Sequence, residues 1–387
     1  MLPNVNITVN RSGLGLVDFT NDGIMGMITF GAAVTGKLEL NDPFVIYSIA
    51  DAEAKGITEA LNPHAWKQVK EFYNECGNGT KLWMIVTGSG LMSSTVSGSA
   101  CIARKLIEAA RGEICLCGIS VGTFLTPTAQ VDGIDGDVVL TVSQAQILAD
   151  EYQALIMPLS FVIDGAGFLG NENVLADLHT MKYHRGSVLL AASENDGVAS
   201  VGQFLGRLAA IPVQRKVSRV KDGALKNLKG FLTDGAPVDD RANALNVLHD
   251  KGYIVYRTFP GKTGYYYSGD PTATANTDDL NTIARNRIID KVFKITYKTY
   301  VEELDDDVPV TQDGKLQPAV CGYLKSMIEL QVNSQMNEEI SNFIAIINPD
   351  QNILSGVPLQ IELQITPMGY LSPINVKLGF INPFLNQ

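Results

Sequence analysis

Positive charge, histidine and long apolar runs are scarce in this sequence. Its 387 residues include 30 Lys and Arg against 41 Asp and Glu, which gives a formal net charge of −11. Proteins that neutralise nucleic-acid phosphates are usually basic, so we expect no nucleic-acid partner. No segment approaches the roughly 20 apolar residues of a membrane-spanning helix, and we therefore expect no membrane insertion. The start, MLPNVNITVNRSG, lacks the features of a signal peptide, which predicts folding in the cytoplasm.

The sequence also offers few metal ligands. It has five cysteines and four histidines. An odd number of cysteines in apolar surroundings predicts reduced, buried thiols rather than a disulfide framework. His179 and His184 are five residues apart, which does not place them on one face of a helix, and neither has a nearby cysteine. We therefore expect no metal site.

The first half of the chain alternates strand-like and helix-like segments. Four continuous apolar runs are typical of strands that are covered on both faces. Segments with apolar residues at helical spacing, such as 64–77 (HAWKQVKEFYNECG), lie beside them. This alternation predicts an α/β sheet flanked by helices. The four runs are 81–88 (KLWMIVTG), 113–120 (EICLCGIS), 158–165 (PLSFVIDG) and 185–193 (RGSVLLAAS).

The last third has α+β character. Residues 251–269 alternate like two antiparallel strands around a Pro-Gly turn, and long helices are expected over 277–303 and 319–336. Apolar residues alternate again at Ile361, Leu363 and Ile365, which predicts a half-buried strand. We therefore divide the chain into an N-terminal linker arm with the first strand (1–25), an α/β body (26–250), a C-terminal α+β domain (251–372) and a C-terminal linker strand (373–387).

No motif makes a convincing active site. The loop from Thr87 to Ala100 follows a buried strand, where a phosphate-binding loop would lie, but it lacks the Gly-Lys-Ser/Thr ending. Asp164 follows another buried strand, with no base and nucleophile pair beside it. We therefore predict no catalytic residue and no cofactor. The alternative is a cytoplasmic α/β enzyme, flavodoxin-like or hydrolase-like, with its site near Asp164 and this loop.

Two acidic clusters are further candidate sites. Asp132, Asp135 and Asp137 have carboxylates that could suit a hard cation, but their spacing is not that of a calcium-binding loop. We interpret this cluster as a solvated turn. The run from Asp305 to Asp307 lies between the two predicted long helices, and we interpret it as a solvated connector.

Strand-like segments lie near both ends of the sequence. The first is 4–10 (NVNITVN). The second lies at the end of the chain, where Ile374, Val376 and Leu378 alternate with other residues. Unpaired strands invite aggregation unless the sheet of another chain receives them. A strand donated to a neighbour links subunits, and different donor and acceptor patches make a contact that can propagate. The residues expected in such contacts are Val5, Ile7, Val9, Ile374, Val376 and Leu378.

Several segments, in order along the chain, resemble the sheath proteins of contractile phage tails and related injection systems. The first is 26–57 (GMITFGAAVTGKLELNDPFVIYSIADAEAKGI), which looks like the start of a sheath body. Residues 69–86 are similar to the helix, turn and buried strand that follow there. The segment 200–213 (SVGQFLGRLAAIPV) resembles a small-residue stretch with Gly-Arg, and 284–292 (ARNRIIDKV) resembles the arginine-bearing helix. The closing 359–383 looks like the terminal strands.

The resemblance implies a structural subunit rather than an enzyme. Such subunits polymerise around an inner tube and contract to drive it through a target envelope, while exchanged terminal strands keep neighbours linked. The implied partners are further copies of the chain, an inner tube protein, and baseplate and terminator or cap proteins, in a virion tail or tail-like particle. Arg285, Arg287 and Asp290 would face the tube or a neighbour. A tube protein itself would be shorter and mainly β.

Overall fold

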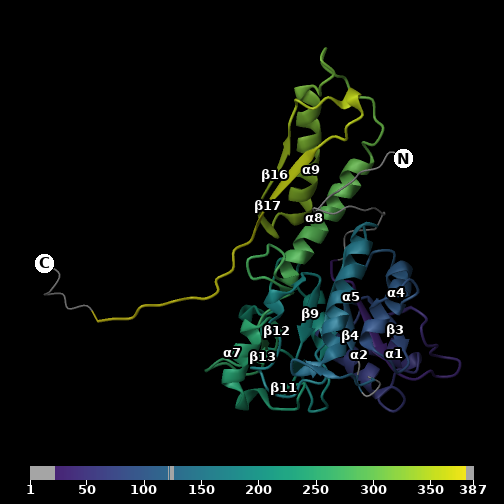
Figure 1. Cartoon of the computed structure of the whole chain (residues 1–387), viewed down its shortest axis with the longest axis vertical. Helices are drawn as coiled ribbons and strands as arrows, with labels where there is room; N and C mark the ends of the chain where they lie inside the picture. The colour runs from purple at the N-terminus through teal and green to yellow at the C-terminus, as the bar shows by residue number, and fades with distance from the viewer. Residues whose placement is uncertain (1–21, 121, 123–125, 381–387) are drawn as a thin grey trace.

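The structure is a computed structural model, and it describes residues 22–120, 122 and 126–380. An α/β body (residues 22–282) occupies one end of the molecule, and a smaller unit of helices and strands (residues 283–367, the C-terminal unit) rises from it (Figure 1). The last described residues extend away from both parts as a long arm (Figure 1).

A seven-stranded sheet forms the centre of the body, in the order β12-β9-β7-β4-β1-β3-β2. Its neighbouring strands are parallel except β2, which is antiparallel to β3. The strands are β1 (Met25–Phe30), β2 (Phe44–Ile46), β3 (Leu82–Thr87), β4 (Leu116–Ser120), β7 (Ser160–Asp164), β9 (Gly186–Leu189) and β12 (Tyr253–Ile254).

Helices cover both faces of this sheet, which explains why its strands read as continuous apolar runs. In β1, Met27 packs into one cluster of buried residues and Ile28 into the other, because successive side chains of a strand point to opposite faces. One face carries α1 (Ile49–Ala54), α2 (Pro63–Cys76) and α6 (Val201–Ala209), and the other carries α3 (Met92–Val96), α4 (Ile102–Ala110) and α5 (Gly136–Gln153).

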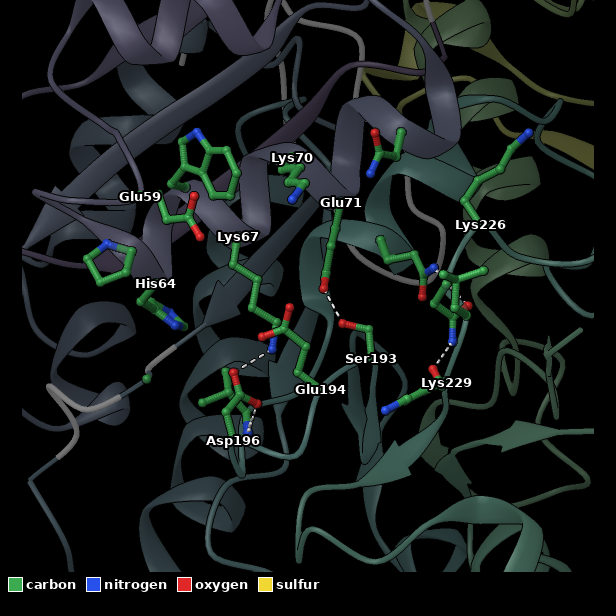
Figure 2. Close-up of a pocket in the computed structure, with 18 residues that line it drawn as sticks. Glu59, His64, Lys67, Lys70, Glu71, Ser193, Glu194, Asp196, Lys226 and Lys229 are labelled. Atoms are coloured by element: carbon green, nitrogen blue, oxygen red, sulfur yellow. Dashed lines mark hydrogen bonds and ion pairs between the residues drawn. The ribbon is translucent and has the colours of Figure 1, made fainter.

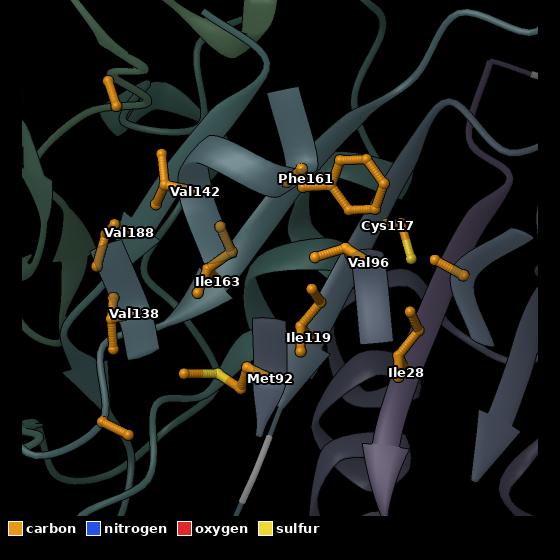
Figure 3. Close-up of a cluster of buried hydrophobic side chains, with 14 of the residues drawn as sticks. Ile28, Met92, Val96, Cys117, Ile119, Val138, Val142, Phe161, Ile163 and Val188 are labelled. Atoms are coloured by element: carbon orange, nitrogen blue, oxygen red, sulfur yellow. The ribbon is translucent and has the colours of Figure 1, made fainter. Parts of the chain in front are cut away.

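Figure 3 shows part of the second cluster, where Met92 of α3 and Val138 and Val142 of α5 lie over Ile119 and Ile163 of the sheet. The prediction of an α/β sheet flanked by helices is confirmed. Among the described residues, the remaining helix of the body is α7 (Ala242–Asp250). The described 3-10 turns of the body are η2 (Leu178–Thr180), η3 (Val220–Asp222) and η4 (Val238–Asp240), and η5 (Ile353–Ser355) lies in the C-terminal unit.

Short antiparallel pairs complete the body. One such pair lies within residues 251–269, where two antiparallel strands were expected, and it places Tyr256 opposite Tyr267. The pairs are β5 (Gln130–Val131) with β6 (Ile134–Asp135), β8 (Lys182–Tyr183) with β15 (Ala273–Thr274), β10 (Ala191–Ala192) with β11 (Phe231–Leu232), and β13 (Tyr256–Arg257) with β14 (Tyr266–Tyr267).

The boundary between the body and the last part lies later than the expected position after residue 250. β12 continues the parallel sheet, with Tyr253 opposite Val188, and β15 pairs with β8 of the body. Alternation of apolar residues in 251–269 suggested a new antiparallel domain, but period-two alternation does not reveal which strand is the partner. The C-terminal unit therefore begins with the long helix α8.

Two glycines let α6 lie directly against α2. A Cβ atom added at Gly202 would lie 2.0 Å from the carbonyl oxygen of Gln68, and one at Gly206 would lie 2.3 Å from that of Phe72. The buried Gln68 side chain bonds across the same contact, accepting from the Gly202 N–H at 2.7 Å and donating to the Ala199 carbonyl at 3.0 Å. The two helices thus touch backbone to backbone.

The C-terminal unit is a pair of helices packed on a two-stranded antiparallel sheet. Apolar residues of α8, α9 and β16 form its core, including Ile295, Ile328, Val332, Phe343 and Ala345, and the apolar residues of β17 are partly buried against this core. The elements are α8 (Ile283–Val301), α9 (Pro318–Met336), β16 (Ile340–Ile347) and β17 (Ile361–Pro367), so both predicted helices and the predicted strand at 361–365 are present.

The first half of α8 belongs equally to the body. Arg185, which precedes β9, forms an ion pair with Asp290 of α8, with 2.7 Å between Nη1 and Oδ2, and these residues are 1% and 5% exposed. Arg185 also donates to Gln153 Oε1 at 2.9 Å. Lys294, one turn further along α8, donates to the carbonyl of Gly112 at 3.0 Å. Body and C-terminal unit are therefore joined through one shared helix.

Replacing Gly206 by alanine should destabilise the body by about 1–3 kcal/mol, because the added methyl group meets the α2 backbone rather than a movable side chain. Urea unfolding followed by tryptophan fluorescence measures this, since Trp66 and Trp83 both lie in the body. The matched control is Gly322→Ala in α9, where an added Cβ meets nothing within 4 Å. That helical glycine should gain about 0.5–1 kcal/mol on becoming alanine. Equal effects of both substitutions would refute the backbone contact.

Asp290→Ala should lower the free energy of unfolding by about 3–5 kcal/mol, because it leaves the Arg185 charge buried without its partner. The same urea titration measures the loss. As a control, Lys325→Ala removes a partly exposed pair with Glu329, at 3.7 Å, and should cost at most about 1 kcal/mol. A loss below about 1 kcal/mol for Asp290→Ala would mean that this pair does not hold the two parts together.

Candidate subunit interface

The sheet of the C-terminal unit has one covered face and one open face. Ile340, Phe343 and Ala345 of β16 are buried against the helices. On the opposite face, Ile344 is 38% and Ile346 is 43% exposed. Their partners on β17 are Gln364 and Glu362, so the outer face is a mixed one with two exposed isoleucines. A two-stranded sheet is marginal by itself, which makes this face a candidate contact surface.

Both outer edges of this sheet lack a strand partner within the described part of the chain. β16 and β17 pair with each other, and no third described strand joins them. One edge group is used locally, because the Ala345 N–H donates to Glu329 Oε1 of α9 at 3.0 Å. Backbone groups along an open edge can bind an added strand through main-chain hydrogen bonds.

Residues 371–380, which we call the C-terminal arm, form no helix or strand and extend away from the molecule (Figure 1). Its apolar side chains recur at every second position, which is the spacing of one face of a strand. Ile374, Val376, Leu378 and Phe380 are all at least 69% exposed. The predicted contact residues of this arm are thus available to another chain. The other three, Val5, Ile7 and Val9, lie outside the described residues.

The arm is fixed at its root by Tyr370. The Tyr370 hydroxyl donates to the carbonyl of Gln214 at 2.5 Å, and the Lys216 ammonium lies 4.8 Å from the centre of the ring. Burial raises the pKa of Tyr370 to about 12, so the hydroxyl keeps its proton at neutral pH. Tyr370 therefore attaches the root of the arm to the segment that follows α6 and contains Gln214 and Lys216.

The first described residue, Asp22, is fixed to α8. Lys291 of α8 lies 2.6 Å from an Asp22 carboxylate oxygen and 2.8 Å from one of Glu339, which precedes β16. Burial lowers the pKa of Lys291, but the two carboxylates more than offset this and raise it, so the ammonium stays charged. Lys291 thus links the start of the described chain to the start of the two-stranded sheet.

The structure places two of the three charged α8 residues differently from our expectation that they face a tube or a neighbour. Arg287 is 3% exposed and donates to the carbonyls of Asp22, at 3.1 Å, and Ile211, at 3.2 Å. Asp290 is buried against Arg185. Their spacing of three places them on one helix face, and that face is turned toward the body. Arg285 is partly exposed, with Nη1 3.2 Å from Asn281 Oδ1.

The residues of the alternative enzyme site serve the fold. Asp164 is fully buried and accepts from the Ala199 N–H at 3.1 Å. The loop after Thr87 contains the short helix α3, whose first N–H groups, at Met92 and Ser93, donate to the Asp137 carboxylate.

The solvated turn expected at residues 132–137 is wrong for two of its three carboxylates. Asp135 and Asp137 are 3% and 2% exposed. Asp135 caps α5 by accepting from the Asp137 N–H at 2.9 Å, and Asp137 binds the start of α3. Carboxylates stabilise helix N-termini, where N–H groups lack partners. Across the described ranges, no group of three or more His, Cys, Asp or Glu residues could hold a metal ion.

Sequence reasoning missed the residues that fix the arms, Lys291 and Tyr370. Tyr370 stands in a Gly/Pro-rich turn (PMGYLSP), where a large aromatic residue is a usable signal of an anchor. Lys291 gave no signal, because its partners lie far away in the sequence. Of the helices that the structure describes, none has the length and apolar character to cross a membrane.

Comparison with solved structures confirms the resemblance to contractile sheath proteins at the level of the fold. The chain is similar to the contracted helical sheath of the anti-feeding prophage, with 12% identity, a TM-score of 0.63 and coverage of 98% of this chain and 99% of that one. It is similar to the contracted sheath complex of PVC, an extracellular contractile injection system, with 11% identity, a TM-score of 0.60 and coverage of 98% and 97%. The sheath tail protein of Listeria innocua matches with 11% identity, a TM-score of 0.50 and coverage of 89% and 95%.

No curated protein matches the sequence. Two family models do, and they divide the chain close to the start of α8. The DUF2586 N-terminal domain matches residues 2–270, and the DUF2586 C-terminal domain matches residues 279–385. The chain therefore belongs to the DUF2586 family and has the fold of a contractile sheath protein.

Proposed function

We propose that this chain is the repeating subunit of a contractile sheath, in which copies are linked by exchanged terminal strands. The observation that carries the proposal is the C-terminal arm, a strand-patterned segment that pairs with no described strand of its own chain. It follows a two-stranded sheet whose edges no other described strand joins. The sheath fold extends over nearly the whole chain, which supports the same reading.

In a neighbouring copy, the arm would be added to a sheet as a further strand, and its backbone N–H and C=O groups would gain hydrogen-bond partners. Each main-chain hydrogen bond contributes about 1 kcal/mol net, and several would form together along an arm of this length. The apolar side chains Ile374, Val376 and Leu378 would lie on one face of the extended sheet, over a core like that of the C-terminal unit. Donor and acceptor surfaces differ, so the contact is heterologous and continues from copy to copy.

The N-terminal segment would act in the same way through Val5, Ile7 and Val9. It leads into Asp22, which Lys291 ties to α8 and to the start of β16. Both arms would therefore pull on the junction where body and C-terminal unit meet. Links of this kind allow bodies to slide and rotate between two packings while the copies stay connected, which is a rigid-body rearrangement.

Contraction in this proposal draws its energy from the difference between two lattice packings, with no nucleotide or cofactor. The partners would be further copies of the chain, an inner tube protein, and baseplate and terminator or cap proteins. Assembly in the cytoplasm would produce a virion tail or a tail-like particle. Of the three charged α8 residues predicted to face a neighbour or the tube, Arg285 is partly exposed and would make that contact.

Replacing the apolar arm residues should abolish polymerisation without unfolding the subunit. In the triple variant Ile374→Ser, Val376→Ser, Leu378→Ser, the strand face that would cover a neighbour becomes polar. The matched control, Asn375→Ser, Lys377→Ser, Gly379→Ser, alters the other face over the same length. We expect tubes of the control but not of the first variant in negative-stain electron microscopy, and the same thermal unfolding for both.

Deleting residues 1–10 or residues 375–387 provides a second test with larger changes. Each deletion should leave a folded, soluble body that does not polymerise. If both deletion variants still form unchanged polymers, the strand-exchange mechanism is refuted. A discrete oligomer that binds a small ligand saturably would favour the α/β enzyme instead.

A further inference from the structure

A cavity of about 690 Å³ lies beside α2, between the 193–198 and 226–229 segments (Figure 2). Its charges are balanced, because four lysines and four carboxyl groups line it and Lys67 forms an ion pair with Asp196 at 2.6 Å. A wall of mixed charge does not select an occupant by the sign of its charge. The end of the chain differs from this cavity, because it carries very few charges.

Residues 351–387 contain only two charged side chains, Glu362 and Lys377, and these have opposite signs. Glu362 lies in β17, and Lys377 lies in the C-terminal arm. Both are exposed, and neither forms an ion pair with a residue that the structure describes. Glu362 accepts one hydrogen bond, from Gln364 Nε2 at 2.7 Å. Each charge is therefore available to a group of opposite charge in another copy.

The two charged residues occupy corresponding positions in the apolar alternation of their segments. In β17, Glu362 is on the open face of the sheet, between two residues that are partly buried against the core. In the arm, Lys377 is between Val376 and Leu378. If the apolar residues of an added arm cover the same core, Lys377 lies on the open face, which is the face of Glu362. The partly buried residues of β17 are Ile361, Leu363 and Ile365.

The free edge of β17 is better suited to receive the arm than the edge of β16. The edge of β16 is partly occupied, because the Ala345 N–H donates to Glu329 Oε1 at 3.0 Å. Leu363 is opposite Ala345, and two opposite residues of an antiparallel pair either bond to each other or both point away. Leu363 therefore presents its N–H and C=O to the free edge of β17. No described residue outside the sheet bonds to the backbone of residues 361–365, so this edge is open to a further strand.

The two charges also select one register of the added strand. Apolar alternation repeats every two residues, so an arm displaced by two positions would still cover the core. An antiparallel arm with Lys377 opposite Glu362 places the apolar residues of the two strands opposite each other. A displacement by two residues would leave Lys377 opposite Gln364 or Gln360 and would lose the ion pair. In the register with the ion pair, Ile374 is opposite Ile365, Val376 is opposite Leu363, Leu378 is opposite Ile361 and Phe380 is opposite Leu359.

Other carboxylates near the sheet are poorly placed to bind Lys377. Glu329, Glu339 and Asp350 each have a lysine partner, at 3.7, 2.8 and 2.9 Å respectively. Glu338 precedes β16, at the end of the sheet that is farther from Glu362. The open face of β16 carries no charged side chain, so an arm added to that edge would leave Lys377 without a partner.

We propose that Lys377 of one copy binds Glu362 of a second copy, and that this pair places the arm on the free edge of β17 in a single register. The inference rests on the proposed strand exchange and names the residues that make it specific. An exposed cross-strand pair of opposite charges contributes little to affinity, and like charges in the same positions are unfavourable. The pair therefore acts mainly by excluding other registers and the other edge.

Charge reversal in the full chain tests this pair. Lys377→Glu places two carboxylates opposite each other, and Glu362→Lys places two ammonium groups opposite each other. Each variant should raise the concentration needed for assembly by about five- to tenfold, measured by sedimentation at low salt. The controls, Lys262→Glu and Glu39→Lys, make the same changes of net charge at exposed residues of the body and should assemble like the unmodified chain. Lys377→Ser, which is part of the triple control variant above, removes the attraction without adding repulsion, so tubes should still form at a concentration raised by about twofold.

Mixing the two reversed variants tests whether the pair forms between copies. In the mixture, the arm of the Lys377→Glu variant meets the sheet of the Glu362→Lys variant with opposite charges. The unmodified arm of the second variant likewise meets the unmodified sheet of the first. The mixture should therefore assemble at the concentration of the unmodified chain. A pair between the arm and the sheet of one chain would not be restored by mixing, so a mixture that assembles no better than either variant alone overturns the inference.

A binding measurement separates this inference from the proposed polymer. A labelled peptide of residues 371–387 is titrated with the full chain below the concentration of assembly, and fluorescence anisotropy is recorded. The peptide should bind the unmodified chain about five- to tenfold more tightly than the Glu362→Lys chain, and a peptide with Lys377→Glu should show the reverse preference. Equal affinities in all four combinations, or no binding in any of them, overturn the inference. If the peptides show these preferences but the chain never forms tubes, the polymer fails and the contact stands.

Discussion

The ion pair between Arg185 and Asp290 holds the two parts of the molecule in one arrangement. It is buried between the central sheet and α8, and the same helix contributes apolar residues to the core of the C-terminal unit. A buried charge pair tolerates little displacement, because separating the charges leaves each without solvent. Position along α8 is therefore fixed relative to the sheet, and everything attached to α8 is fixed with it.

The chain segments that lead to the two arms are attached at or near that helix. Lys291, one residue after Asp290, ties Asp22 and Glu339 to α8, while Tyr370 holds the C-terminal arm against the segment around Gln214. An exchanged strand attached to a flexible part of the subunit would not transmit the movement of a neighbouring subunit. In the proposed polymer both links would end where the body meets the C-terminal unit, so displacement of one subunit would be passed to the body and the two-stranded sheet of the next.

Much of the fold could be predicted, because strands that are buried on both faces of the sheet appear in the sequence as continuous apolar runs. The strand β3 reads as an uninterrupted apolar run, and the alternation at Ile361 to Ile365 marks β17. The domain boundary, the inward direction of Arg287 and the capping role of Asp137 could not be predicted. Each depends on a partner far away in the sequence, such as Asp22 for Arg287, and local spacing carries no information about it. The candidate interface was half predictable, since the apolar alternation of the arm is visible but its anchor is not.

Negative-stain electron microscopy of the purified, concentrated chain tests the central claim most directly. The account predicts hollow tubes with regular striations, because each copy carries both a donor arm and an open sheet edge. Uniform small particles at every concentration would contradict it and would leave the exposed arm without a function.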